Sequence, residues 1–204
     1  MDELEGRLAE YYDREGRSRA AMPLGRSRID VRSAFVELLH GERRQRLIDV
    51  GSGPGRDAVY FAASGFATTA VDRSIGHARL AAAAGLVSVQ ATLLALPFPP
   101  GTFDAGWTMS TLVHVPDERW DAALTSVINV LKPAAPLAIG LWGGVDDERW
   151  HPPRNGLPSR FFSLRSHDRA QLMLQRHGDL DSFVTWTDDR SEWEYQFAVL
   201  RVRP

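Results

Sequence analysis

Three glycines at alternate positions lie where an apolar run gives way to a helical pattern. The run LIDV is followed by Gly51, Ser52, Gly53, Pro54 and Gly55, and its last acid is Asp49. Glycines let the backbone approach a ligand closely, and the N-terminus of a following helix offers free N–H groups to a nucleotide. The same residues would also suit a tight turn that binds nothing, so both interpretations stay open at this point.

A carboxylate follows at the end of the next apolar run. Asp72 closes the segment TTAVD, 17 residues after Gly55. A carboxylate at such a strand end can accept hydrogen bonds from both hydroxyls of a ribose, although it could instead cap the next helix. A dinucleotide fingerprint has the spacing GxGxxG, whereas this chain has GxGxG followed by Arg56. The spacing therefore disfavours a nicotinamide cofactor.

Apolar spacing predicts the elements that position these residues. Two helices are expected before the first strand, separated near Pro23 and Gly25. Strands are then predicted at 47–50, 67–71, 87–90, 103–108 and 137–141, alternating with helices at 58–63, 77–84 and 117–131. A loop is expected over 143–164, followed by a helix at 168–176 and two hairpin strands at 182–187 and 194–202, joined across 187–191.

This alternation predicts an α/β fold, a doubly wound and mostly parallel sheet with an antiparallel C-terminal hairpin. We expect one domain over residues 1–204, within the usual size range. Its parts would be N-terminal helices that could form a lid (1–45), a cofactor-binding core (46–142), a substrate-side insert (143–165) and the C-terminal helix and hairpin (166–204).

Composition excludes several kinds of site. The 204 residues include no cysteine, which rules out disulfides, thiolate metal sites and thiol nucleophiles. A net charge of −2 disfavours sequence-independent binding of nucleic acid. The sequence has no signal-peptide pattern and no apolar stretch of membrane-spanning length, so we expect a cytoplasmic protein without a membrane partner. The arginines between Arg14 and Arg32 fit either a solvated arm or an anion clamp over a pocket.

From Leu47 to Gly140 the chain resembles the class I S-adenosylmethionine-dependent methyltransferases, in particular their type 11-like members. LIDVGSGPGRDAVYFAASGFATTAVDRS is similar to their first two motifs, LPFPPGTFDAGWTMSTLVHVPD to the segment around their fourth strand, and VINVLKPAAPLAIG to the helix and fifth strand that follow. The resemblance implies a Rossmann-like fold and S-adenosyl-L-methionine as cofactor, released as S-adenosyl-L-homocysteine.

The resemblance also implies roles for single residues. The glycine turn would wrap the methionine part of the cofactor, Asp72 would hold its ribose and Arg73 would lie along its adenine. The backbone around Thr108 would face the methionine amino group. The implied cofactor-binding residues are Asp49, Gly51, Ser52, Gly53, Gly55, Asp72, Arg73, Thr92, Leu93 and Thr108.

One position departs from the family. Its members often have an acid four residues before the leucine of LPF, where the acid accepts a hydrogen bond from the adenine amino group, and this chain has Thr92 there. A hydroxyl accepts that bond without charge assistance. We therefore expect the adenine to depend more on the amide of Leu93 and on apolar walls such as Leu94.

Methyl transfer is an in-line displacement that depends mainly on alignment of the two partners, and it needs a general base only when the accepting atom keeps its proton. His114, after the fourth predicted strand, is the candidate base, although it could equally shape a turn or the pocket. The candidate substrate-binding residues are Tyr11, Tyr12, His114, Trp142 and Trp150, each of which could alternatively be a packing residue.

We therefore expect a methyltransferase that acts on an oxygen or nitrogen atom of a small molecule. No metal is expected, because the histidines lack metal-ligand spacing and His77, like the others outside the motifs, is interpreted as structural. The alternatives are methylation of RNA or protein, a non-catalytic cofactor-binding module and an NAD-dependent dehydrogenase.

Overall fold

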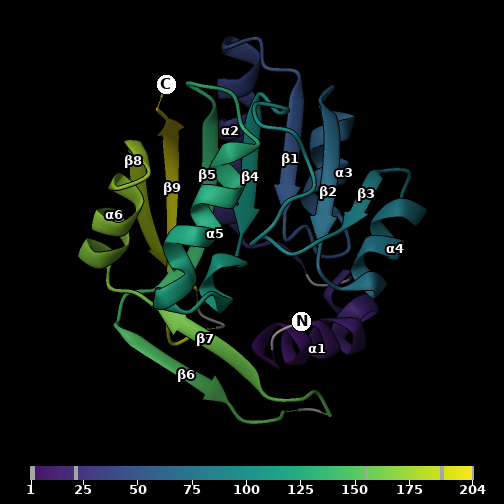
Figure 1. Ribbon diagram of the computed structural model, residues 1–204, viewed down its shortest axis with the longest axis vertical. Helices are drawn as coiled ribbons and strands as arrows, with labels where there is room; N and C mark the ends of the chain where they lie inside the picture. Colours follow the sequence, from purple (N-terminus) through teal and green to yellow (C-terminus); the bar gives the residue numbers. More distant parts are fainter. Residues whose placement is uncertain (1–2, 21–22, 155, 189–190, 204) are drawn as a thin grey trace.

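A seven-stranded sheet in the order β3-β2-β1-β4-β5-β9-β8 forms the centre of the computed structural model, which describes residues 3–20, 23–154, 156–188 and 191–203 (Figure 1). Its strands are β1 (Arg46–Val50), β2 (Ala67–Asp72), β3 (Val87–Gln90), β4 (Ala105–Met109), β5 (Pro136–Gly143), β8 (Gly178–Thr187) and β9 (Glu194–Val202). β1 to β5 are parallel, whereas β9 is antiparallel to both β5 and β8. The predicted mostly parallel sheet with a C-terminal hairpin is confirmed, and Asp189 and Arg190 of the hairpin turn lie outside the described residues.

Helices cover both faces of this sheet (Figure 1). They are α1 (Glu3–Ala20), α2 (Arg26–Gly41), α3 (Arg56–Ala63), α4 (Ile75–Ala83), α5 (Asp117–Asn129) and α6 (His167–Gln175), with a short 3₁₀ turn η1 (Leu112–His114). Successive strand residues point to opposite faces. Accordingly, Ile48 packs in the core cluster that contains α5 and α6, and Leu47 packs in the cluster that contains α2 and Phe61 of α3.

Several predicted boundaries differ from the structure, and two of these differences share one cause. The fourth strand begins at Ala105 rather than at Phe103, because Phe103 instead forms an isolated bridge with Leu131. That bridge also ends α5 early, at Asn129, with Val130 as its C-cap. Both differences come from one pairing between residues far apart in the sequence, which apolar spacing does not report.

The segment predicted as a loop over 143–164 is wrong in part. It contains β6 (Asp147–His151) and β7 (Arg160–Leu164), which form a separate antiparallel pair with Trp150 opposite Phe161. The prolines and glycine between the two strands indicate a loop, and each strand has only five residues, which is too short for a clear alternation.

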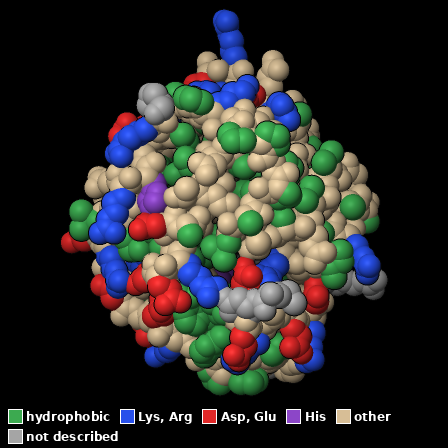
Figure 2. Space-filling model, in the orientation of Figure 1, with side chains coloured by type: hydrophobic (Ala, Val, Ile, Leu, Met, Phe, Trp, Pro, Cys, Tyr) green, Lys and Arg blue, Asp and Glu red, His purple; other side chains and the backbone are tan. Residues whose placement is uncertain are grey.

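The carboxyl ends of the parallel strands meet at one edge of the sheet, near which α1 and the β6–β7 hairpin lie (Figure 1). In α/β sheets ligands bind at this edge. On the face shown in Figure 2, basic and acidic side chains are interspersed rather than gathered by sign. Within the described part of the chain, no helix is both long and apolar enough to cross a membrane.

The arginine-rich segment 14–32 does not act as a unit. Arg14 and Arg26 form ion pairs on exposed helix surfaces, with Glu10 and Asp30 respectively. Arg28 and Arg32 instead turn inward to Asp57, while the side chains of Arg17 and Arg19 lie outside what the structure describes.

Candidate active site

Two adjoining cavities open at the carboxyl edge of the parallel strands. The inner cavity lies between α1 and the ends of β1, β2 and β4, and Asp72, Arg73 and Thr92 contribute to its lining. The outer cleft is lined by residues of α2, the β6–β7 insert and the β8–β9 hairpin. The two share the lining residues Tyr12, Gly51, Gly53, Met109, Ser110 and His114. Molecules bound in the two cavities would therefore meet across this shared set.

The three glycines of the turn serve three different purposes. A Cβ on Gly51, at φ +74°, would lie 1.9 Å from the Thr111 hydroxyl oxygen, and one on Gly55, at φ +90°, would lie 2.9 Å from Leu86. Only Gly53 would direct a Cβ into open space, with no described atom within 4 Å. Gly51 and Gly55 are thus required by packing, and Gly53 is the glycine that leaves room in the cavity.

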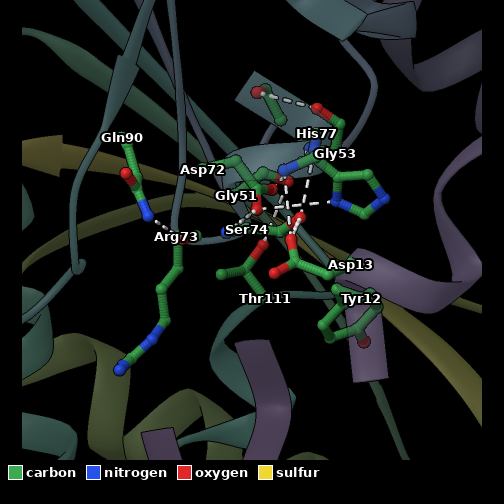
Figure 3. Close-up of polar contacts among 12 residues, drawn as sticks. Tyr12, Asp13, Gly51, Gly53, Asp72, Arg73, Ser74, His77, Gln90 and Thr111 are labelled. Atoms are coloured by element: carbon green, nitrogen blue, oxygen red, sulfur yellow. Dashed lines mark hydrogen bonds and ion pairs between the residues drawn. The ribbon is translucent and has the colours of Figure 1, made fainter. Parts of the chain in front are cut away.

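Asp72 is oriented by two backbone amides (Figure 3). Its Oδ2 accepts the N–H of Gly53 at 2.7 Å, and its Oδ1 accepts the N–H of Ser74 at 2.8 Å. The carboxylate therefore ties the glycine turn to the start of α4, where Ser74 caps the helix by accepting the N–H of His77 at 3.0 Å. Asp72 therefore has a structural role, and its carboxylate also lines the inner cavity, where a ligand could reach it.

His77 is a polar residue of the inner cavity that the sequence interpretation missed. Its side chain is 2 % exposed, its Nδ1 lies 3.5 Å from Oδ1 of Asp72, and neither ring nitrogen has a hydrogen-bond partner among the described residues. Buried polar atoms are rarely left without a hydrogen bond, so we expect a molecule bound in the cavity to form one with the His77 ring. His77 lies in the first turn of α4, directly after the strand that ends at Asp72, and this position in the sequence could have indicated that it faces the cavity.

Helix α1 closes the inner cavity through acidic side chains. Oε1 of Glu5 accepts the Thr92 hydroxyl at 2.6 Å and pairs with a guanidinium nitrogen of Arg73, also at 2.6 Å. Asp13 accepts the Ser74 hydroxyl and the N–H of Gly76. These contacts place α1 over the groups that follow β2 and β3, and no sequence motif predicts them.

Tyr12 and His114 meet where the two cavities join. His114 Nδ1 lies 2.6 Å from the Phe161 carbonyl oxygen, and Nε2 lies 2.5 Å from the Tyr12 hydroxyl. Because a carbonyl can only accept, Nδ1 carries a proton that it donates to Phe161. In the neutral ring Nε2 is then an acceptor, and Tyr12 donates to it.

The outer cleft has aromatic and basic walls. Trp142 and Tyr11, two of the candidate substrate-binding residues, line it, and Arg160 lies over the Tyr11 ring at 4.7 Å. Trp150 is not among its described lining residues, because Arg7 covers the Trp150 ring at 3.7 Å. The neighbouring His151 lines the cleft instead, and burial together with the nearby arginines lowers its pKa.

A buried charge network supports the cleft on the side of α2 and α3. Asp57 accepts hydrogen bonds from Arg28 at 2.6 Å, Arg32 at 2.9 Å and the Trp107 indole at 3.1 Å. Burial alone would raise the pKa of Asp57, but these donors outweigh burial and hold that pKa below its ordinary value. Burial and the Asp57 charge raise the pKa of Asp49 well above its ordinary value, and Asp49 Oδ2 has no described partner.

The remaining predicted residues lie close to the cavities to different degrees. Leu93 lines the inner cavity and Ser52 lines the outer cleft. Thr108 is 1 % exposed and packed in the sheet, and the residues after it that line the inner cavity are Met109, Ser110 and Thr111. Among the described residues, no group of three His, Asp or Glu side chains is arranged to hold a metal ion.

Comparison with known proteins identifies methyltransferases as the relatives of this chain. Residues 47–134 match the family model described as "Methyltransferase domain". An uncharacterized methyltransferase of Mycobacterium sp. (strain JLS) is 30 % identical over 197 residues, which cover 84 % of this chain and 77 % of that protein. The O-methyltransferase rstn1 of Aspergillus nomiae is 37 % identical over 112 residues, 50 % of this chain and 49 % of the relative. The chain thus spans about half the length of that fungal protein.

A solved structure agrees over the whole chain. The DhpI–SAH complex superimposes with a TM-score of 0.73 at 20 % sequence identity, covering 98 % of each chain. At this identity the agreement describes the fold alone.

Proposed function

The chain belongs to the class I S-adenosylmethionine-dependent methyltransferases, and we propose on this basis that it methylates a hydroxyl group of a small molecule, with His114 as general base. Membership of this family sets aside the alternative of an NAD-dependent dehydrogenase. The observation that carries the proposal is the position of His114, which lines both cavities and whose Nε2 accepts a hydroxyl group.

The polar groups of the inner cavity fit the cofactor. The Asp72 carboxylate is oriented by two amides, and the nearby ring nitrogens of His77 lack described partners, as suits groups that await ribose hydroxyls. We assign Asp72 to the ribose, Arg73 and the Leu93 amide to the adenine, and the turn from Asp49 to Gly53 to the methionine part. When bound, S-adenosylmethionine supplies an electrophilic methyl group on a sulfonium sulfur.

His114 has the geometry of a base for an oxygen acceptor. The Phe161 carbonyl holds the ring so that Nδ1 keeps its proton and Nε2 offers its lone pair to the space between the cavities. Tyr12 donates to Nε2 in the structure, so an acceptor hydroxyl would replace Tyr12 and transfer its proton to the same atom. A positioned base of this kind contributes about 10²- to 10⁴-fold to the rate.

The outer cleft supports a small, flat acceptor. Trp142, Phe162 and Trp193 offer aromatic faces and edges, and Arg160 offers positive charge. Such walls suit a planar or anionic molecule. The resemblance to a protein named as an O-methyltransferase favours oxygen over nitrogen as the accepting atom.

Labelled cofactor identifies the type of acceptor. The purified protein would be incubated with methyl-labelled S-adenosylmethionine and a cell extract, which is then separated into small molecules, RNA and protein. We expect label in small molecules as alkali-stable methyl ethers. Label in RNA or protein would replace this proposal with the corresponding alternative, and transfer to nothing despite cofactor binding would favour a non-catalytic module.

Histidine variants test the base, with the labelled acceptor in hand. We expect His114→Gln to lower turnover by about 10²- to 10⁴-fold while S-adenosylhomocysteine still binds. His151→Gln is the informative comparison, because His151 lines only the outer cleft, and His177→Gln is a remote control because His177 pairs with Asp121 on an exposed surface. A His114→Gln enzyme with wild-type turnover across the pH range would refute the assignment of the base.

A further inference from the structure

A half-buried carboxylate on α1 contributes to the inner cavity far from any sequence motif. The Glu5 side chain is 19 % exposed and lies beside Arg73 and Thr92. The surrounding cavity wall is apolar, formed by Leu4, Leu8, Ala91, Leu93 and Leu94. A carboxylate in such a slot loses hydration, and the ion pair with Arg73 and the hydrogen bond from Thr92 offset that loss at one of its two oxygens, Oε1.

The hydrogen bonds of Thr92 determine which oxygen can accept from a ligand. Because a carboxylate only accepts, the Thr92 hydroxyl donates its single proton to Glu5, at 2.6 Å. The same hydroxyl oxygen accepts the N–H of Leu94 at 3.2 Å. Protein groups therefore use the donor and one of the two lone pairs of the Thr92 hydroxyl, and the stronger, charged acceptor at this end of the cavity is the carboxylate of Glu5.

We propose that Glu5 recognises the 6-amino group of the cofactor's purine, so that α1 takes part in base recognition as well as covering the cavity. This inference rests on the proposed function, which assigns the cofactor to the inner cavity. A carboxylate attracts an exocyclic amino group, which donates, and repels a 6-oxo group, which only accepts. Glu5 would thus supply, from a distant part of the chain, the charged acceptor that Thr92 cannot.

Paired ligands that differ only at this position give a direct test. Titration calorimetry would measure Kd for S-adenosylhomocysteine and for S-inosylhomocysteine, in which a 6-oxo group replaces the 6-amino group. We expect the wild type to prefer the adenosyl ligand. In Glu5→Gln we expect S-adenosylhomocysteine to bind about tenfold more weakly, the loss of one charge-assisted hydrogen bond, and the preference to narrow because the amide can donate to a 6-oxo group.

Glu3→Gln is the matched control. It makes the same charge change on the same helix, but the Glu3 side chain is 86 % exposed and lies outside the described lining of the cavity. The ratio of the two Kd values comes from one folded population, so partial misfolding of a variant does not alter it. We expect the wild-type ratio in Glu3→Gln.

The outcomes separate the two levels of inference. A wild-type ratio in Glu5→Gln, with S-adenosylhomocysteine bound by both proteins, would overturn the role of Glu5 and leave the proposed function intact. A wild-type protein that fails to bind S-adenosylhomocysteine would overturn the proposed function and, with it, this assignment.

Discussion

Substitution of Asp72 by asparagine should weaken both the fold and cofactor binding. Asp72 uses one oxygen for the N–H of Gly53 and the other for the N–H of Ser74. An asparagine keeps a single oxygen, so one amide loses its partner. Because hydrogen bonds to charged groups contribute about 1.5–3 kcal/mol each, we expect a loss of about 2 kcal/mol of unfolding free energy. In a domain of this size that lowers Tm by about 4–8 °C.

The effect on binding is worked out in the same way. Ribose hydroxyls would lose charge-assisted acceptors, which predicts a Kd for S-adenosylhomocysteine about 10- to 100-fold higher in Asp72→Asn. Calorimetry at a temperature well below Tm measures Kd, and thermal unfolding without ligand measures the change in stability.

Asp104→Asn is a closely matched control. Asp104 lies at the opposite, amino edge of the sheet, where its Oδ2 accepts the N–H groups of Gln45 and Arg46. The two aspartate side chains are almost equally buried, at 13 % exposure for Asp104 and 12 % for Asp72. Asp104→Asn keeps one oxygen for both amides but loses the ion pair between Oδ1 and Lys132, so it should lower the stability while keeping the wild-type Kd. If both variants bound S-adenosylhomocysteine with the wild-type Kd, Asp72 would organise the turn without contacting the cofactor.

Three further outcomes are expected. Asp57→Asn leaves Arg28 and Arg32 buried without a charged partner, which should cost about 3 kcal/mol of unfolding free energy at pH 7. Because the fold lowers the pKa of Asp57, this difference from wild type should shrink in urea titrations as the pH falls through that pKa. Asp49→Asn should raise Tm at pH 8. The fold raises the pKa of Asp49, so the wild type loses stability as the pH rises through that pKa, whereas the asparagine variant does not. A lower Tm in the variant would contradict this reasoning. Tyr12→Phe removes the hydroxyl that competes with the acceptor for His114 Nε2, so the KM for the acceptor should fall about fivefold in initial-rate kinetics. A higher KM would instead assign Tyr12 to acceptor binding.

Sequence reasoning succeeded where the structure is encoded locally. The glycine turn, Asp72 and the alternation of strands and helices each lie within a few tens of residues, and spacing alone indicates their arrangement. Even there, the separate purposes of Gly51, Gly53 and Gly55 became clear only from their neighbours, because Thr111 and Leu86 are distant in the sequence.

Contacts across the chain account for what could not be predicted. Glu5 reaches Thr92 over 87 residues, and Tyr12 reaches His114 over 102, with neither pair marked by a motif. Trp150 was expected at the substrate because it is aromatic and lies in the insert, yet its ring packs under Arg7. The register of β6 with β7 determines which residues of these short strands face the cleft, and no pattern in the sequence predicts that register.

The position of β9 has a consequence for how the chain acquires its shape during synthesis. β8 joins the sheet only through β9, and Tyr195 of β9 accepts the Arg28 side chain at 2.7 Å. A nascent chain that emerges from its N-terminal end first therefore exposes β8 before any neighbour can pair with it. The groups around Asp72 can assemble while translation continues, whereas the wall that Tyr195 completes must wait until β9 has left the ribosome.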